Sequence, residues 1–315
     1  MAVAVANPPL GGAGTAANPA YSGVFIPEIW SGKLLEKYYN ATVLSAISNT
    51  DYEGEIKNKG DKVKIRTKPT ITIKDYQVDM PLTLERPSSN LLEFTIDYAK
   101  YFNEILDDVM EVQADVNMLS MWADDASEQL KIVIDTVVLT LLDPGVAAAN
   151  KGSTAGKISG DINLGAAGAP VAITPANAID AIVDLGTTLD EQNIPETGRW
   201  LVVPAWLAGM IKKSDLRDAS ITGDNVSLLR NGRIGMIDRF TLYSSNLLPT
   251  VTEGAAKATR IFAGHPHGLT YAAQINNVET MRSEQTFGTI LRGLTVFGAK
   301  VLDGIALAEL YAIKG

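Results

Sequence analysis

Residues 116–142 read VNMLSMWADDASEQLKIVIDTVVLTLL, and this stretch decides the fold. Apolar residues recur in it at every third or fourth position, which is the spacing of one face of an α-helix. Each helical residue adds ~1.5 Å, so the pattern predicts a helix roughly 40 Å long. The next residues, Asp143-Pro144-Gly145, are a strong stop signal and are expected to end the helix sharply.

The segment before this helix has the pattern of β-structure. Between residues 62 and 74, polar residues occupy the even positions and apolar residues most of the odd ones, which predicts a strand. Pro69 cannot donate to a sheet ladder, so this strand is expected to lie at an edge or to break there. A second alternating stretch follows at 92–98. We therefore predict that residues 54–99 form a long hairpin-like loop with little core of its own.

Two segments precede the hairpin. Residues 1–24 are a low-complexity stretch of Ala, Gly, Pro and Asn without any charge, so they cannot form a core. Residues 1–27 are expected either as a disordered tail or as an arm that becomes ordered against neighbouring subunits. Residues 28–53 lead to the hairpin, and apolar residues at near-helical spacing after Pro27 predict a helix over 27–48.

The second half of the chain alternates between short helices and strands. A Gly- and Ala-rich loop is expected over 145–172, and a helix is expected to open with Thr174 as its N-cap and to close at Pro195. A second helix is predicted over 205–213, and strands over 199–203, 240–244, 259–263, 269–273, 289–297 and 304–312. This order predicts an α+β fold without the regular alternation of a doubly wound sheet.

Composition excludes several classes of protein. The 315-residue chain has no cysteine, so disulfides, thiolate metal sites and cysteine nucleophiles are ruled out. Its formal net charge of −9 argues against a protein that grips nucleic acid through its own charge. The longest apolar runs fall far below the ~20 residues of a membrane span, so no membrane partner is expected.

The motifs that could carry chemistry are weak. Residues 152–157 read GSTAGK, but Lys151 stands where a phosphate loop needs glycine, and Ile158 stands where it needs Ser or Thr. A surface loop is the favoured interpretation. His265 and His267 are the only histidines, and Pro266 and Gly268 predict a turn there rather than a metal site. We predict no catalytic residue, metal or cofactor.

Charge is distributed unevenly around the hairpin. Residues 54–74 hold seven basic and two acidic side chains, a net +5, whereas residues 75–128 hold two basic and thirteen acidic ones, a net −11. The carboxylates between Asp97 and Glu128 are interpreted as a solvated face, as a docking face or as a hydrolase site with paired carboxylates. Electrostatic potentials of opposite sign on two surfaces help to set how one subunit is aligned on another. The predicted inter-subunit contact joins Lys62, Lys64, Arg66 and Lys68 to Asp107, Asp108, Glu111 and Asp115.

The order of these parts resembles the major capsid fold that tailed bacteriophages share with encapsulins. Three strings carry the resemblance. Gly60-Asp61-Lys62-Val63 is similar to the start of the family's hairpin loop, and YAKYFNEILDD at 98–108 is similar to its exit toward the long helix. GRIGMIDRF at 232–240, followed by YSSNLLP at 243–249, resembles an axial-domain pattern, although Arg239 stands where glycine is frequent.

The resemblance implies a division into parts. It assigns an N-terminal arm at 1–27, an extended β-hairpin loop at 54–99 and a peripheral domain with a spine helix at 100–174. It assigns an axial domain at 175–274 and, at 275–315, strands that return to the peripheral domain. No long charged coiled coil precedes the arm and Met1 is present, so neither a fused scaffolding region nor a cleavage is expected. Nothing identifies a Lys–Asn cross-link.

The resemblance further implies a major capsid protein that self-assembles into the icosahedral shell around the phage genome. Its implied partners are copies of itself in hexamers and pentamers, a separate scaffolding protein, and a portal protein at one vertex. Double-stranded DNA would be enclosed without sequence-specific binding, and assembly would take place in the host cytoplasm. Two alternatives remain at this point: an encapsulin-like compartment, and a soluble enzyme that uses the acidic cluster at 107–111.

Overall fold

The computed structural model describes residues 42–51, 62–66, 69, 71–87, 91–108, 118–214, 236–254, 256–284 and 286–315. The expected arm and most of the predicted helix at 27–48 lie outside these residues, as do the strings at 60–61 and 232–235. Of that helix, the described part is the single turn α1, Leu44–Ile47. Lys68, Glu111 and Asp115 also lie outside the described residues.

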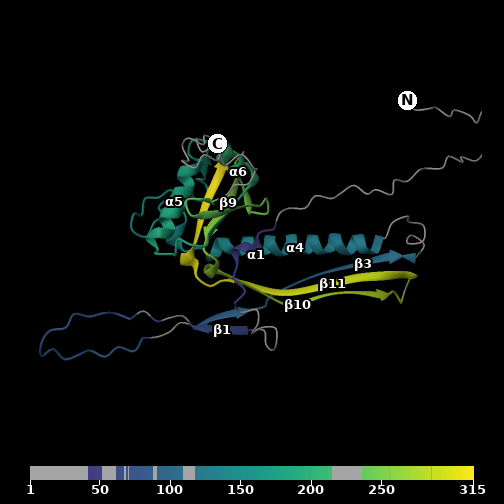
Figure 1. Ribbon diagram of the computed structural model, residues 1–315, viewed down its shortest axis with the longest axis horizontal. Coiled ribbons are helices and arrows are strands. Elements are labelled where there is room, and N and C mark those ends of the chain that lie inside the picture. The colour runs from purple at the N-terminus through teal and green to yellow at the C-terminus, as the bar shows by residue number, and fades with distance from the viewer. Residues whose placement is uncertain are drawn as a thin grey trace, which may run out of the picture. The chain divides into compact units, whose positions relative to one another are not determined.

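The long helix is confirmed as α4, which spans Met118–Gly145. It reaches Gly145, slightly farther than predicted, because the Val146 N–H still donates to the Leu142 carbonyl (3.1 Å) after Pro144. α4 runs alongside a three-stranded antiparallel sheet (Figure 1). The strand order is β10 (Leu269–Arg282), β11 (Gly288–Val301) and β3 (Tyr98–Asp107). β10 and β11 are much longer than the predicted 269–273 and 289–297.

The hairpin is only partly a β-ladder. β1 (Lys62–Arg66) pairs antiparallel with β2 (Leu91–Thr95), and the last paired residues are Arg66 and Leu91. The predicted continuation of the strand to residue 74 is wrong, because residues 71–77 belong to no strand. Pro69, Pro81 and Pro87 lack the N–H that a ladder needs at both arms of the loop. The second predicted strand is also divided, since β2 ends at Thr95 and β3 begins at Tyr98.

A seven-stranded mixed sheet forms the second part of the fold. Its order is β4-β12-β9-β5-β7-β6, and β8 pairs with β9. The strands are β4 (Val171–Ile173), β5 (Arg199–Val203), β6 (Met236–Ile237), β7 (Phe240–Ser244), β8 (Thr250–Glu253), β9 (Ala256–Gly264) and β12 (Leu307–Lys314). β11 pairs antiparallel with β3 in the three-stranded sheet. β12 joins the seven-stranded sheet, where it pairs with β4 and β9.

Two helices accompany this sheet, α5 (Ala178–Glu191) and α6 (Ala205–Lys213). α6 agrees with its prediction, whereas α5 begins later than the predicted Thr174 cap. The Asn177 side chain accepts from the Thr174 backbone N–H (2.7 Å) and hydroxyl (3.1 Å), so residues 174–177 form a separate turn. No helix in the described part of the chain combines the length and apolar character needed to cross a membrane.

The main hydrophobic core joins the seven-stranded sheet, α5, α6 and the C-terminal half of α4. All five residues of β5 are buried, as the apolar run at 200–203 predicts for four of them; the fifth is the charged Arg199. Short 3-10 turns connect the elements, namely η1 (Ala148–Asn150), η3 (Pro266–Gly268) and η4 (Gly304–Ala306). η3 confirms the predicted turn at the histidines, where His265 Nδ1 accepts from the His267 backbone N–H (3.2 Å).

Candidate assembly surfaces

The basic residues of the hairpin lie on the exposed face of β1. We call Lys62, Lys64, Arg66 and Lys68 the basic strand. Lys62, Lys64 and Arg66 are exposed, whereas Val63 and Ile65 turn inward, which confirms the predicted alternation over 62–66. Lys64 lies 3.8 Å from the Glu93 carboxylate on β2, a weak exposed pair. The three described cations of the basic strand are therefore exposed to a partner, and Lys64 is only weakly paired.

The predicted acidic counterpart is partly neutralised within the chain. Arg282 on β10 donates to both carboxylate oxygens of Asp108 (2.6 and 2.7 Å), and these hydrogen bonds lower the pKa of Asp108 below its ordinary value. Asp107 is exposed at the end of β3 and also has an interaction within the chain. No ion pair joins β1 to either aspartate among the described residues. Their predicted contact therefore requires a second copy.

Residues 71–87 carry exposed apolar side chains, of which the sequence prediction placed only Ile71 and Ile73 on the apolar face of a strand. We call residues 71–87 the apolar loop. Its exposed members include Ile73 (89%), Val78 (84%) and Leu84 (99%). Within it, the Met80 N–H donates to the Gln77 carbonyl (3.1 Å), and Lys74 Nζ donates to the Thr83 hydroxyl (2.8 Å). So many exposed apolar groups in one segment indicate an interaction surface.

The hairpin is anchored to the three-stranded sheet through a small apolar cluster. Phe94 on β2 is fully buried against Ala272 on β10, with Val63 and Ile65 packed beside it. Gly298 on β11 permits this close approach, because a Cβ there would meet the Thr95 carbonyl oxygen at 2.6 Å. Lys300 also donates from Nζ to the Glu93 carbonyl (2.6 Å). The base of the hairpin is therefore fixed on the sheet, whatever the apolar loop contacts.

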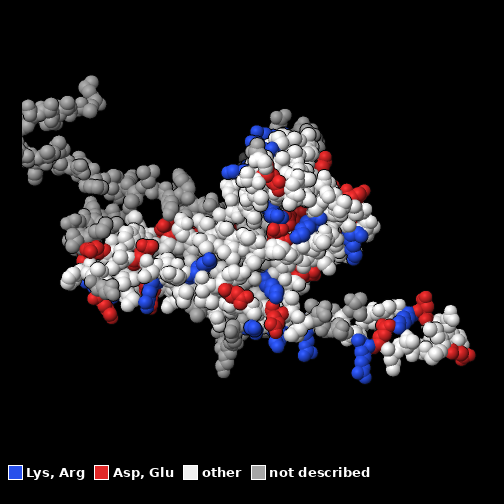
Figure 2. Space-filling view, turned by 180° about the vertical axis from the view of Figure 1, so that it is seen from behind, with Lys and Arg blue, Asp and Glu red and all other residues white. Residues whose placement is uncertain are grey.

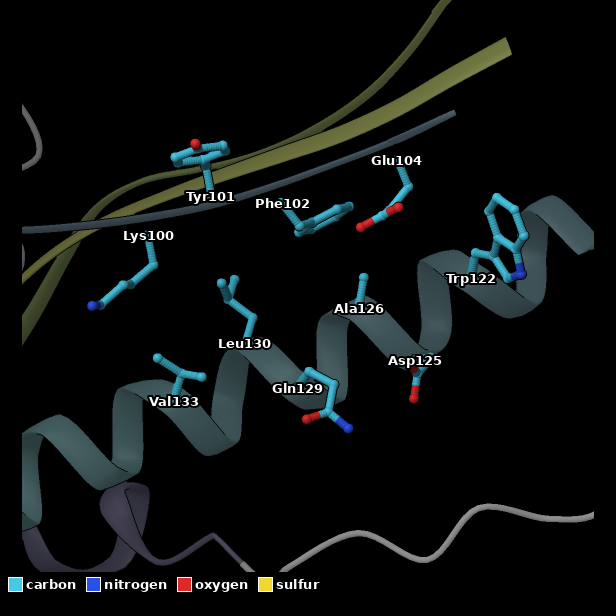
Figure 3. Close-up of a pocket in the computed structure, with 10 residues that line it drawn as sticks. All are labelled: Lys100, Tyr101, Phe102, Glu104, Trp122, Asp125, Ala126, Gln129, Leu130 and Val133. Carbon is cyan, nitrogen blue, oxygen red and sulfur yellow. The ribbon is translucent and has the colours of Figure 1, made fainter. Parts of the chain in front are cut away.

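A groove of about 440 Å³ lies between β3 and α4 (Figure 3). Figure 3 shows Phe102 directed from β3 toward the helix, and Leu130 and Ala126 directed from α4 toward the strand. Tyr101 points away from the helix and is 78% exposed. The groove has an apolar floor and a charged rim that includes Lys100 and Glu104. Such a surface suits contact with another protein chain rather than a small substrate.

A cluster of ion pairs, formed by Asp143, Arg260 and Glu309, connects the end of α4 to the seven-stranded sheet, and we call it the ionic joint. Arg260 on β9 bonds Asp143 of α4 (2.8 Å) and also the Glu309 carboxylate of β12. Glu309 is 2% exposed, and its Oε2 has no hydrogen-bond partner among the residues described. Burial raises the pKa of Glu309 above its ordinary value, although hydrogen bonding and charge from Arg260 oppose that shift. Periodicity could not reveal this joint, because its members lie far apart in sequence.

The phosphate-loop-like string has a structural role. The backbone N–H groups of Ile158 (2.7 Å) and Ser159 (3.2 Å) donate to the Glu191 carboxylate at the end of α5. The bond from Ile158 is the main reason that the pKa of Glu191 falls below its ordinary value. The Glu191 carboxylate thus binds the backbone N–H groups that a phosphate loop would offer to a phosphate. The predicted surface loop at 152–157 is confirmed. Among described residues, no cluster of metal-ligating side chains was found.

Charge on the surface is mixed in sign. Figure 2 shows acidic and basic side chains interspersed over the visible face, without a broad area of either sign. A surface that binds DNA tightly would gather Lys and Arg on one face. The view agrees with the net charge of −9.

Comparison with solved structures places this fold among phage capsids. A protein of Mycobacterium phage Che8 is 27% identical, with a TM-score of 0.75 over 92% of this chain and 98% of that one. The capsid of Cyanophage P-SCSP1u is 16% identical, with a TM-score of 0.68 over 93% and 94%. The mature capsid of bacteriophage PhiM1 is 15% identical, with a TM-score of 0.63 over 95% of both chains. The fold is therefore that of tailed-phage capsid subunits.

The family follows from the sequence itself. The model of the family described as phage capsid protein matches residues 96–310, well over half of the chain. The chain belongs to this family. It is a major capsid protein, a structural subunit that assembles in many copies into the icosahedral head shell of the virion. A comparison with curated proteins found no match.

Proposed function

We propose that the subunits assemble into hexamers and pentamers through the hairpin of one copy lying on the next. The exposed basic strand and the apolar loop support this, because the described cations of the strand and most described apolar side chains of the loop are exposed in the single chain. A contact between two different patches of the same chain is heterologous, and it closes into rings when the rotation allows. The exposed apolar loop is the single observation that carries the proposal.

We further propose the division into arm, hairpin loop, peripheral domain and axial domain at the boundaries expected from sequence. The basic strand contacts the acidic region that includes Asp107, Asp108, Glu111 and Asp115 on an adjacent subunit. Since Arg282 already pairs with Asp108, that carboxylate contributes less to this attraction than its charge alone suggests. Exposed pairs contribute only ~0.2–1 kcal/mol each, so they set register more than affinity.

The remaining partners follow from the role of a shell. A separate scaffolding protein directs curvature, a portal protein occupies one vertex, and double-stranded DNA is enclosed without sequence-specific contacts. The mixed surface charge supports a wall that does not hold the packed DNA tightly. Assembly takes place in the host cytoplasm, and the subunit has no catalytic activity.

The test is expression of the protein alone and together with the neighbouring genes of its phage. Light scattering and negative-stain microscopy should detect closed shells in at least one of these preparations. If every preparation contains only monomers and dimers, the proposed function is wrong.

A further inference from the structure

Among the residues that the structure describes, one edge of β10 is unpaired over most of its length. It is an outer strand of the three-stranded sheet, and β11 pairs with it on one side only. On its other side, Asn49 pairs with the start of the strand through the bond from the Tyr271 N–H to the Asn49 carbonyl (3.0 Å). Beyond the irregularity at Ala273/Ile275, no described residue pairs with this side of β10.

The hydrogen-bond pattern identifies which backbone groups face this edge. The Ser283 N–H donates to the Gly288 carbonyl (3.0 Å), so the Ser283–Gly288 pair is hydrogen-bonded. In an antiparallel ladder, bonded and non-bonded pairs alternate. Glu279 and Met281 therefore bond to β11, whereas the N–H and C=O groups of Val278 and Thr280 point outward. Val278 is 47% exposed and Thr280 is also exposed.

Beyond the irregularity at Ala273/Ile275, the sequence of this edge gives little protection against strand addition. Proteins commonly blunt open edges with Lys or Pro, or with inward-pointing charges. Residues 275–282 read INNVETMR and contain no Lys, Pro or Gly. Their two charges are paired within the sheet, Glu279 with Arg292 and Arg282 with Asp108. The stretch therefore offers a long backbone edge without net charge.

The same chain holds an extended segment that lacks a partner strand. Residues 71–77 read ITIKDYQ, and their backbone N–H groups make no hydrogen bond within the described chain. Ile71 and Ile73 are 68% and 89% exposed, and the β-branched Ile-Thr-Ile run favours strand geometry. Seven residues of strand span about 23 Å, which matches the roughly 26 Å of residues 275–282.

We propose that residues 71–77 of one copy add as a fourth strand to the open edge of β10, at 275–282, in another copy. The two segments do not pair within one chain, and a shell supplies other copies. Main-chain hydrogen bonds would provide affinity in this mode of recognition, and side chains would fix the register. The inference rests on the proposed function. It adds a backbone contact between copies to the side-chain contacts of the basic strand and the apolar loop.

Proline substitution tests the backbone contact. The variant Val278→Pro/Thr280→Pro removes two outward N–H groups and leaves the bonds from Glu279 and Met281 to β11 in place. Asn103→Pro is the matched control, because Asn103 faces outward on β3, the opposite edge of the sheet. We expect at least tenfold fewer shells from the β10 variant, near-normal yield from the control, and little change in the melting temperature of either unassembled protein.

Cysteine cross-linking supplies a second readout, since the native chain has no cysteine. Thr280→Cys is combined in turn with Ile71→Cys, Thr72→Cys or Ile73→Cys, and assembled shells are oxidised. At least one pair should give a ladder of covalent oligomers on a non-reducing denaturing gel, whereas Asn103→Cys with the same partners should not.

The outcomes separate the two proposals. If the unaltered protein forms no shells, the proposed function itself is wrong. If it forms shells while the β10 proline variant assembles as well as the control and no pair cross-links, the strand addition alone is overturned. Equal loss of shells in the β10 variant and the control would also overturn it, because damage to the sheet would then explain the loss.

Discussion

Arg260→Met should destabilise the subunit by leaving Glu309 buried without its cation. In the native joint, Arg260 bonds both Glu309 and Asp143 and lies over the Tyr311 ring, 5.0 Å from its centroid. Asp143 is partly exposed and can be solvated, whereas Glu309 is 2% exposed and cannot. Removal of one partner of a buried ion pair typically costs about 3–5 kcal/mol. Methionine retains much of the packing, so the loss reports mainly on charge.

The cost has an upper limit that depends on pH. Glu309 can escape by binding a proton, which costs ~1.4 kcal/mol for each pH unit above the ordinary glutamate pKa near 4.3. The limit is therefore about 3.7 kcal/mol at pH 7 and about 1 kcal/mol at pH 5. Burial already raises the pKa of Glu309 in the folded protein, so the folded state holds more protons than the unfolded state. The free energy of unfolding consequently falls as the pH rises above the pKa of Glu309 in the unfolded chain. In Arg260→Met this fall with pH should be steeper than in the native protein.

Urea unfolding of the unassembled subunit at pH 5 and pH 7 measures both effects. The double variant Arg260→Met/Glu309→Gln should recover most of the stability lost at pH 7, because no buried charge remains. A loss below ~1 kcal/mol at pH 7, or a loss that is equal at both pH values, would refute the reasoning. So would a double variant as unstable as Arg260→Met, since packing rather than charge would then be the cause.

Three other changes test separate parts of the subunit. Reversal of all four basic-strand cations to Glu should block shell formation while urea unfolding of the unassembled protein stays normal; normal shells would contradict the ionic contact. Asp135→Ala should cost about 2–4 kcal/mol in urea unfolding, because the buried carboxylate accepts from the Val43 and Leu44 backbone N–H groups (3.0 Å each); Asp135→Asn should cost less. Deletion of residues 2–22 should leave the melting temperature of the unassembled protein nearly unchanged and reduce the number of shells that survive a urea challenge, whereas a large drop in that temperature would place the arm inside the subunit fold.

The sequence was sufficient where a pattern is set by burial within one chain. α4 and β5 follow from their apolar spacing, because each buries its apolar residues in the subunit's own core. The alternation of exposed and half-buried residues in β1 also follows from the sequence, because Val63 and Ile65 pack within the subunit. The order of hairpin, long helix and later strands, together with the string at 243–249, was enough to indicate the family.

The sequence misled where the partner of a segment lies elsewhere. Residues 71–74 have a strand pattern, yet the chain supplies no ladder for them, because periodicity records side-chain preference and not the presence of a partner. The distal half of β10 was missed for the opposite reason. INNVETMR has little alternation, and its strand geometry comes from pairing with β11. The ionic joint was missed because Asp143 and Arg260 are 117 positions apart.

The arrangement of donor and acceptor on one chain bears on how a shell can close. A heterologous contact propagates from copy to copy, and the angle between copies decides between a ring and an open filament. Here the apolar loop is continuous with β1 and β2, and β2 is held on the sheet by Phe94 and Gly298. The acceptor β10 is the direct neighbour of β11, the strand that carries Gly298. The base of the hairpin and the proposed acceptor strand thus belong to one packed unit, which is held together by the packing at Gly298 and by the pairing of β10 with β11.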